Sequence, residues 1–174
     1  MYKLRELERG DLPILNKWRN DKELIDCLGA PFRFINMETD EKWFNSYMQN
    51  RNSAIRCSII SENDEFIGLI SLTSIDSINK SAELHIMIGN KNYHGKGAGT
   101  FAVNSMLKHA FENLNLNKVE LSVLENNNKA IALYEKCGFV YEGKRRQAVY
   151  KDNKYLDLYL YSILKEESLW KSKF

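Results

Sequence analysis

A glycine-rich loop in the middle of the chain is the segment whose residue types and spacing most clearly suggest chemistry. It follows an alternating stretch at 81–88, precedes an amphipathic stretch, and reads His94, Gly95, Lys96, Gly97, Ala98, Gly99 and Thr100. Glycines let the backbone turn tightly so that several N–H groups face one point, and a helix starting there adds unpaired donors and partial positive charge. The pattern predicts a site for an anion such as a pyrophosphate, although a plain tight turn would use the same glycines.

Two common nucleotide-binding loops do not match this spacing. A Walker A loop needs Lys directly after its last glycine and then Ser or Thr, whereas Lys96 lies between two glycines and Thr100 follows Gly99. A dinucleotide-binding fingerprint that starts at Gly95 needs Gly or Ala three residues after Gly97, where Thr100 stands. The loop therefore gives little support to a nucleotide-dependent oxidoreductase.

Alternation of apolar and polar residues predicts the strands that position the loop. They are expected near residues 2–7, 54–61, 65–73, 81–88, 119–123, 139–150 and 155–164, with turns at 62–64 and 151–153. In the strand at 81–88, Glu83, His85 and Met87 alternate with apolar residues. One face of this strand should join the core, and the other should form a site.

Helical periodicity and capping residues predict four helices. The first begins at Asp11 with Pro13 in its first turn, the third begins near Gly97, and the fourth ends at Gly138. The second begins at Thr39, and its expected buried stripe is Trp43, Phe44, Tyr47 and Met48. The segment 27–36 should be irregular, and the whole is an α/β (α+β) chain around a mixed sheet.

Length, charge and cysteine content limit the possible classes. A chain of 174 residues without linkers or repeats is expected to form one domain over residues 1–174. The net charge of +2 gives no reason to expect a nucleic-acid partner. Three scattered cysteines predict neither a disulfide framework nor a metal site, and no apolar run approaches the roughly 18 residues of a membrane span. We expect a cytoplasmic protein with no metal and no membrane partner.

Two segments together resemble the GNAT superfamily of acetyl-CoA-dependent N-acetyltransferases. Residues 94–100 resemble the family's Q/R-x-x-G-x-G/A loop, with His94 in place of the usual Gln or Arg, and residues 127–139 resemble its N-x-x-A-x-x-L-Y-x-x-x-G-F helix. The opening residues 4–12 and the late residues 142–157 resemble the branch of ribosomal-protein N-terminal and spermidine acetyltransferases. The resemblance implies a mixed, mostly antiparallel sheet of six to seven strands flanked by about four helices.

The same resemblance implies the roles of the site residues. Acetyl-CoA would be the cofactor, with its pyrophosphate on residues 94–100 and its acetyl carbonyl near the backbone of Met87 and Ile88. Asn127 and Lys129 would also lie against the cofactor, although Asn127 could instead cap its helix. Tyr134 would be the general acid, although it fits the apolar stripe of its helix equally well.

Three further side chains leave alternatives open. Glu83 would be the general base and His85 the second candidate, but both could be ordinary strand residues. Cys137 lies on the apolar face of its helix, so core packing is preferred over a covalent acetyl-cysteine.

The acceptor is expected to be a small molecule with a primary amine. A polyamine is preferred because of the family branch, and a nucleotide-linked amino sugar or a protein N-terminal amine are alternatives. The charges support both kinds of acceptor. The acidic set is Glu23, Asp26, Glu38, Asp40 and Glu41, and the basic set is Arg33, Arg56, Lys144, Arg145 and Arg146. A non-catalytic acyl-CoA-binding regulatory domain is the alternative of another class, and self-association is expected by analogy with relatives.

Overall fold

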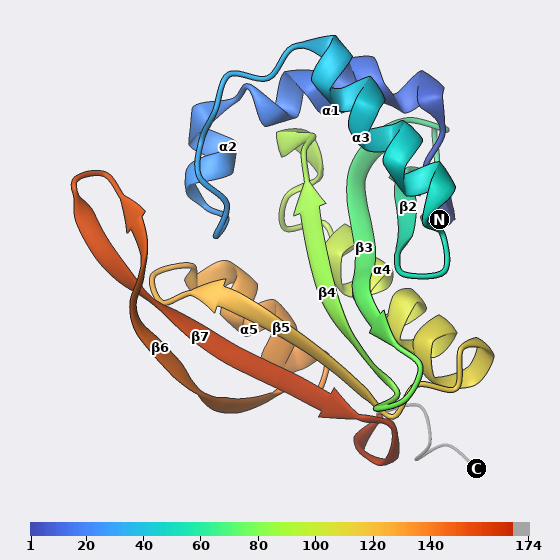
Figure 1. Ribbon diagram of the computed structural model, residues 1–174, viewed down its shortest axis with the longest axis vertical. Coiled ribbons are helices and arrows are strands. Elements are labelled where there is room, and N and C mark those ends of the chain that lie inside the picture. Colours follow the sequence, from blue (N-terminus) through green and yellow to red (C-terminus); the bar gives the residue numbers. More distant parts are fainter. Residues whose placement is uncertain (169–174) are drawn as a thin grey trace.

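The alternating segments form one seven-stranded sheet in the computed structural model, which describes residues 1–168 (Figure 1). The strands lie in the order β1-β2-β3-β4-β5-β7-β6, and every neighbouring pair is antiparallel except β4 and β5. Their bounds are β1 Lys3–Glu6, β2 Ile55–Ile60, β3 Phe66–Asp76, β4 Ser81–Ile88, β5 Lys118–Leu124, β6 Val140–Lys151 and β7 Lys154–Leu164. The predicted mixed, mostly antiparallel sheet is confirmed.

Five α-helices, three 3-10 turns and one π turn complete the described part of the chain. The α-helices are α1 Leu12–Arg19, α2 Lys22–Asp26, α3 Met37–Gln49, α4 Ala98–Lys108 and α5 Asn128–Lys136. The short turns are η1 Arg9–Asp11, η2 Lys91–Tyr93, the π turn η3 His109–Asn113, and η4 Lys165–Glu167. Among residues 1–168, no helix has the length and apolar character needed to cross a membrane.

The two faces of the sheet bury separate apolar clusters. One cluster joins α4 and α5 to the sheet through residues such as Val103, Leu107 and Val119. The other joins α1 and α3 to the strands at the β1 end through residues such as Leu15 and Phe44. Side chains on β4 therefore alternate between two different helical layers, as the period of two requires.

Several predicted details of the helices are wrong. Asp11 precedes α1 but does not cap it, because its carboxylate instead accepts two hydrogen bonds from Arg5, both 2.7 Å, and one from Ser58. Burial alone would raise the pKa of Asp11, but these hydrogen bonds lower it. Helix α3 begins two residues before the predicted Thr39, because the side chain of Asn36 accepts the Thr39 N–H. Met48 is 47% exposed and is not part of the buried stripe.

The final hairpin is longer and tighter than predicted. Strand β6 includes Lys151, so the turn consists of Asp152 and Asn153 alone, both with positive φ, as two-residue hairpin turns favour. Lys151 is buried and donates to the carbonyls of Ile25 and Ala30 at 2.9 and 2.7 Å. The hairpin end is thereby attached to the irregular segment 27–36, whose lack of regular structure is confirmed.

Candidate active site

The glycine loop presents a group of unpaired backbone donors. Gly95 and Gly97 adopt φ values of +74° and +84°, and α4 begins directly after them. Within residues 1–168, no hydrogen bond is made by the N–H groups of Gly95, Gly97, Ala98, Gly99 and Thr100. A Cβ on Gly95 or Gly97 would meet no atom within 4 Å, so there is open space over the loop. These donors and this space fit the diphosphate of a coenzyme A-type cofactor.

His94, which stands in place of the usual Gln or Arg of such a loop, makes its contact within the protein. Its Nε2 lies 2.8 Å from the carbonyl oxygen of Ile88 and must donate, because a carbonyl only accepts. This bond ties the loop to the end of β4. The exposed side chain of Lys96 places its Nζ 5.7 Å from the Tyr93 ring centroid, while its carbonyl accepts the Tyr2 hydroxyl at 3.0 Å.

Strands β4 and β5 pair over only three residues each and then separate. The parallel pairs join Ser81–Glu83 to Lys118–Glu120, and Figure 1 shows the two strands diverging beyond that point. Met87 and Ile88 lie in the separated part and pair only with β3. The edge of β4 that faces β5 therefore lacks a strand partner there, as an oxyanion-type backbone donor requires.

Glu83 and His85 lie together on the face of β4 that points away from α4. The His85 Nε2 is 3.0 Å from Thr73 Oγ1 and 3.7 Å from Glu83 Oε1, and the side chains are 54% and 37% exposed for His85 and Glu83. The pKa of His85 is lowered, first because surrounding protein displaces water; Glu83 opposes this effect, and the positive charge of Arg56 adds to it. The imidazole is thus neutral near pH 7 and available to accept a proton.

Tyr134 occupies the other side of the sheet, in the cluster with α4. It is 7% exposed and packs edge-on against Phe139 at a ring distance of 5.8 Å. Its hydroxyl makes no hydrogen bond within the described residues. Burial, with a smaller effect from Cys137, raises the pKa of Tyr134 to about 12. The phenol therefore keeps its proton at neutral pH, as a general acid must.

Cys137 is a core residue, as the sequence favours. It is buried in the same cluster, and burial raises the pKa of its thiol to about 11, against a small opposing effect of Lys136. A thiol with this pKa is almost wholly protonated at neutral pH. The arrangement supports direct transfer rather than an acetyl-cysteine.

The side chain of Asn127 is held by hydrogen bonds within the protein. Its side-chain oxygen caps α5 by accepting the Ala130 N–H at 3.2 Å, and its side-chain nitrogen donates to the Cys27 carbonyl at 2.9 Å. Both ends of the amide are thus engaged within the protein. Lys129 is exposed in the first turn of α5.

Arg56 places a positive charge on the same face of the sheet as His85, and it was not among the predicted catalytic residues. Arg56 on β2 is two strands away, in the register Arg56, Ser71, His85, and its guanidinium lies 4.7 Å from the Trp43 ring centroid. Asp40, a member of the acidic set expected to attract the acceptor, is 0% exposed and pairs with Arg19 at 2.7 Å. It therefore stabilises the fold and does not face the acceptor. In the sequence, Arg56 stood out only as one member of the basic set.

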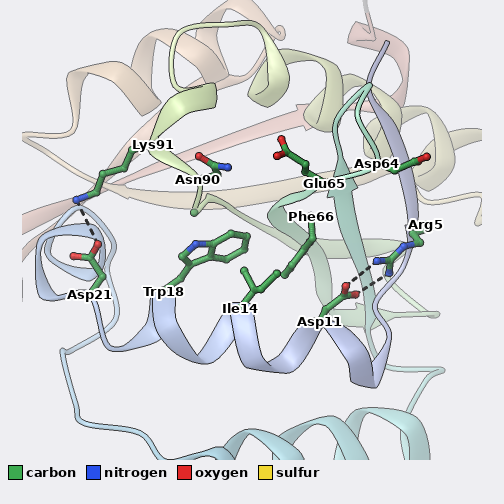
Figure 2. A pocket seen from close by; sticks show the side chains of 11 residues that line it. Arg5, Asp11, Ile14, Trp18, Asp21, Asp64, Glu65, Phe66, Asn90 and Lys91 are labelled. Carbon is green, nitrogen blue, oxygen red and sulfur yellow. Dashed lines mark hydrogen bonds and ion pairs between the residues drawn. The ribbon is translucent and has the colours of Figure 1, made fainter.

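A pocket of about 710 Å³ lies away from these residues, between α1, the β2–β3 turn and the end of β4 (Figure 2). Ile14, Trp18 and Phe66 line it, and two pairs of its charged groups lie together, with Arg5 bound to Asp11 and Lys91 close to Asp21. A Cβ on Gly89 would lie 2.0 Å from the Trp18 ring, so this glycine lets α1 pack on the end of β4. None of the predicted site residues lines this pocket.

Comparisons with known proteins agree with this geometry. Residues 2–140 match the model of the acetyltransferase (GNAT) domain. A spermidine N(1)-acetyltransferase of Vibrio cholerae is 32% identical over 171 residues, which cover 98% of this chain and 96% of the relative. The N-acetyltransferase p20 of Bacillus licheniformis is 31% identical over 94% of this chain and 93% of its own length. The crystal structure of the V. cholerae spermidine N-acetyltransferase with CoA and spermine superposes with a TM-score of 0.90 at 31% identity, covering 95% of this chain and 96% of that one.

The match thus extends over nearly the whole chain, in sequence and in structure. The chain therefore belongs to the GNAT family of acetyltransferases, which take their acetyl group from acetyl-CoA.

Proposed function

We propose that this chain transfers an acetyl group from acetyl-CoA to a primary amine of a polyamine such as spermidine. The observation that carries this proposal is the near full-length likeness, at a TM-score of 0.90, to a spermidine N-acetyltransferase in complex with CoA and spermine. In this proposal, residues of the described part of the chain carry out each step of the reaction.

The cofactor would be held by main-chain groups. The free N–H groups between Gly95 and Thr100 would bind its diphosphate, and exposed Lys129 in the first turn of α5 would add positive charge. Bound acetyl-CoA supplies the acetyl group as a thioester. Backbone N–H groups near Met87 and Ile88, on the unpaired edge of β4, would polarise the acetyl carbonyl.

Glu83 and His85 would prepare the acceptor nitrogen. An alkyl ammonium with a pKa of about 10.4 is almost fully protonated at pH 7, so it must lose a proton before it can attack. The Glu83 carboxylate would attract the ammonium, and the neutral His85, 3.7 Å from Glu83, would accept its proton directly or through water.

The nitrogen then forms a bond to the acetyl carbon while the carbon–sulfur bond breaks. The sulfur leaves as a thiolate and would take the proton of Tyr134, which the phenol holds until that step because burial raises its pKa to about 12. The nitrogen would lose its second proton as the amide forms, and this proton would restore the phenol through water. The base and the acid lie on opposite faces of the sheet, so the reactants would meet where β4 and β5 separate.

Acidic residues beside Glu83 support a polycationic acceptor. Glu83 lies opposite Glu120 across the β4–β5 pair, and like charges in facing positions are unfavourable without a cation between them. Lys118 lies 3.6 Å from Glu120 but also pairs with Glu142 at 2.9 Å. Two carboxylates, Glu120 and Glu142, thus share one lysine, and Glu83 has only His85 beside it, so the ammonium groups of a polyamine would balance the remaining negative charge.

Release of the CoA thiol, measured with spermidine, spermine and a neutral hydroxyl analogue, tests this proposal. We expect steady turnover with the polyamines, and Glu83→Gln should lower kcat/KM for spermidine by about tenfold to a hundredfold, because the ammonium loses one charge-assisted contact. Glu62→Gln, on the exposed β2–β3 turn, is the matched control. Tight CoA binding without turnover on any amine would instead favour a regulatory acyl-CoA-binding domain.

We further propose a cytoplasmic location, supported by the free state of Cys27, Cys57 and Cys137.

We also propose self-association, which is supported by exposed apolar side chains on the final hairpin, among them Tyr141, Tyr150 and Tyr155. Light scattering across a concentration series would measure the assembly.

A further inference from the structure

Arg56 is a partly buried cation whose hydrogen bonds are incomplete. Its Nη1 donates to Ser71 Oγ at 3.3 Å, and its guanidinium lies against the rings of Trp43 and Tyr47, with centroid distances of 4.7 and 5.7 Å. The Nε of Arg56 is buried and has no hydrogen-bond partner, and it is the one buried side-chain nitrogen or oxygen in residues 1–168 of which this is true. Buried polar groups in native proteins are nearly always satisfied, so this exception needs an explanation.

The charge of Arg56 also lacks a counterion. Within residues 1–168 no carboxylate lies within ion-pair distance of it, whereas Arg19, whose guanidinium lies 4.2 Å from the same Trp43 ring centroid, is paired with Asp40. Burial lowers the pKa of Arg56, and the nearby charge of Arg19 lowers it further. An uncompensated cation in such a position is unfavourable unless a ligand supplies the missing anion.

The position of Arg56 relates it to the reaction. Arg56, Ser71 and His85 are consecutive register partners across β2, β3 and β4, so their side chains share one face of the sheet. Two strand spacings separate the backbones of Arg56 and His85 by about 10 Å. Glu120 and Glu142 lie toward the opposite edge, beyond Glu83. The face therefore has an acidic end and a cationic end, with His85 between them.

We infer that Arg56 is an anion subsite, and that the enzyme also acetylates primary amines that carry a carboxylate or phosphate a few bonds away from the nitrogen. An Arg guanidinium offers a planar fork that matches both oxyanions, and its stacking on Trp43 restricts its orientation in advance. The amine of such an acceptor would lie at Glu83 and His85, and its anionic group would extend along the register row to Arg56. The acceptor ammonium loses one proton to the base and a second as it gains the acetyl group, and the second proton balances the one that CoA takes up as it leaves as a thiol, as with a polyamine.

This inference rests on the proposed acetyl transfer to amines but not on the choice of a polyamine. Thiol release would be measured with three matched series of two to six carbons: aminoalkyl phosphates, ω-amino carboxylates and simple alkylamines. Spermidine would be included in every assay. We expect the best anionic acceptor to exceed the alkylamine of equal length in kcat/KM by about tenfold to a hundredfold, the range of one charge-assisted contact. The phosphate and carboxylate arms identify which oxyanion Arg56 prefers.

Variants assign the preference to Arg56. Arg56→Gln should abolish it, and Arg56→Lys should retain part of it, because the charge remains without the fork. Arg9→Gln is the matched control, since Arg9 also stacks on a ring of α3, that of Phe44 at 5.1 Å, but is exposed and paired with Glu41. Propyl phosphate, which has no amine, should compete with the acceptor rather than with acetyl-CoA in the wild type.

The outcomes separate this inference from the proposed function. Spermidine turnover without any preference for anionic amines would refute the subsite alone, as would a preference that persists in Arg56→Gln. If the Gln variant fails to fold, the wild-type series and the propyl phosphate competition still decide the matter. Absence of turnover with every amine would refute the proposed reaction itself.

Discussion

Replacing Tyr134 with Phe removes one hydroxyl from a buried ring and leaves the rest of its packing in place. The edge-on contact with Phe139 at 5.8 Å remains, and no described group loses a hydrogen-bond partner. We therefore expect the free energy of unfolding to change by less than about 0.5 kcal/mol, which corresponds to a midpoint shift within about 2 °C for a protein of this size.

The effect on catalysis should be much larger than the effect on stability. A positioned general acid contributes about 100- to 10,000-fold, so kcat with spermidine should fall by at least about 100-fold in Tyr134→Phe. The affinity for CoA should change by less than about threefold, because only the departing sulfur needs the proton. Because the pKa of Tyr134 is raised to about 12, this residue should add no loss of activity at mildly alkaline pH.

Single-turnover release of the CoA thiol is the appropriate assay, since it reports the chemical step rather than product release. Tyr2→Phe is a suitable control, because that phenol bonds to the carbonyl of Lys96 in the loop and lies outside the reaction centre. A Tyr134→Phe variant that folds, binds CoA and transfers acetyl at the wild-type single-turnover rate would refute the role of the phenol.

Asp40→Asn should lower the free energy of unfolding in urea by about 3–5 kcal/mol, because it leaves the guanidinium of Arg19 in the protein without a counterion. The double variant Arg19→Met/Asp40→Leu should lose less, and a larger loss would contradict this reasoning. Gly89→Ala should cost about 1–3 kcal/mol in the same titration, since a Cβ there meets an indole ring at 2.0 Å, whereas Gly10→Ala has open space and should be neutral. Equal effects of the two glycine variants would count against the packing argument. For His85, whose pKa is lowered by burial, the midpoint of the rise of kcat/KM with pH should lie below that of an ordinary imidazole. A rise that persists unchanged in His85→Gln would show that another group is the base.

The sequence predicts the strands well because the sheet is half-buried on each face, so apolar and polar residues must alternate. Glu83, His85 and Met87 show this on β4, where three polar-face positions alternate with buried Ala82 and Leu84. The loop at 95–100 is predicted for a similar reason, since positive φ at Gly95 and Gly97 requires glycine.

The errors lie where long-range contacts override local signals. Asp11 has the residue type and position of a helix cap, but Arg5 and Ser58 from two strands take its carboxylate. Helix α2 is only five residues long and was not predicted, because so short a segment shows no clear periodicity. Its capping residue, Asp21, was the one local signal available.

The charges of the acceptor face show the same limit. In the sequence, Asp40 and Arg56 were equally good candidates for contact with the acceptor, one as a member of the acidic set and the other as a member of the basic set. In the fold, Asp40 is fully buried against Arg19, whereas Arg56 has no carboxylate within reach in the described part of the chain. Only the cross-strand register, which sequence patterns do not fix, places Arg56 in line with His85.

The central claim is that backbone N–H groups of residues 95–100 bind the diphosphate of acetyl-CoA. Calorimetric titration of the wild type with CoA and with pantetheine, which lacks the diphosphate, tests it most directly. We predict that CoA binds at least about 100-fold more tightly than pantetheine, a difference of about 2.7 kcal/mol. Equal affinities, or no heat of binding with CoA at millimolar concentration, would contradict the assignment of the loop.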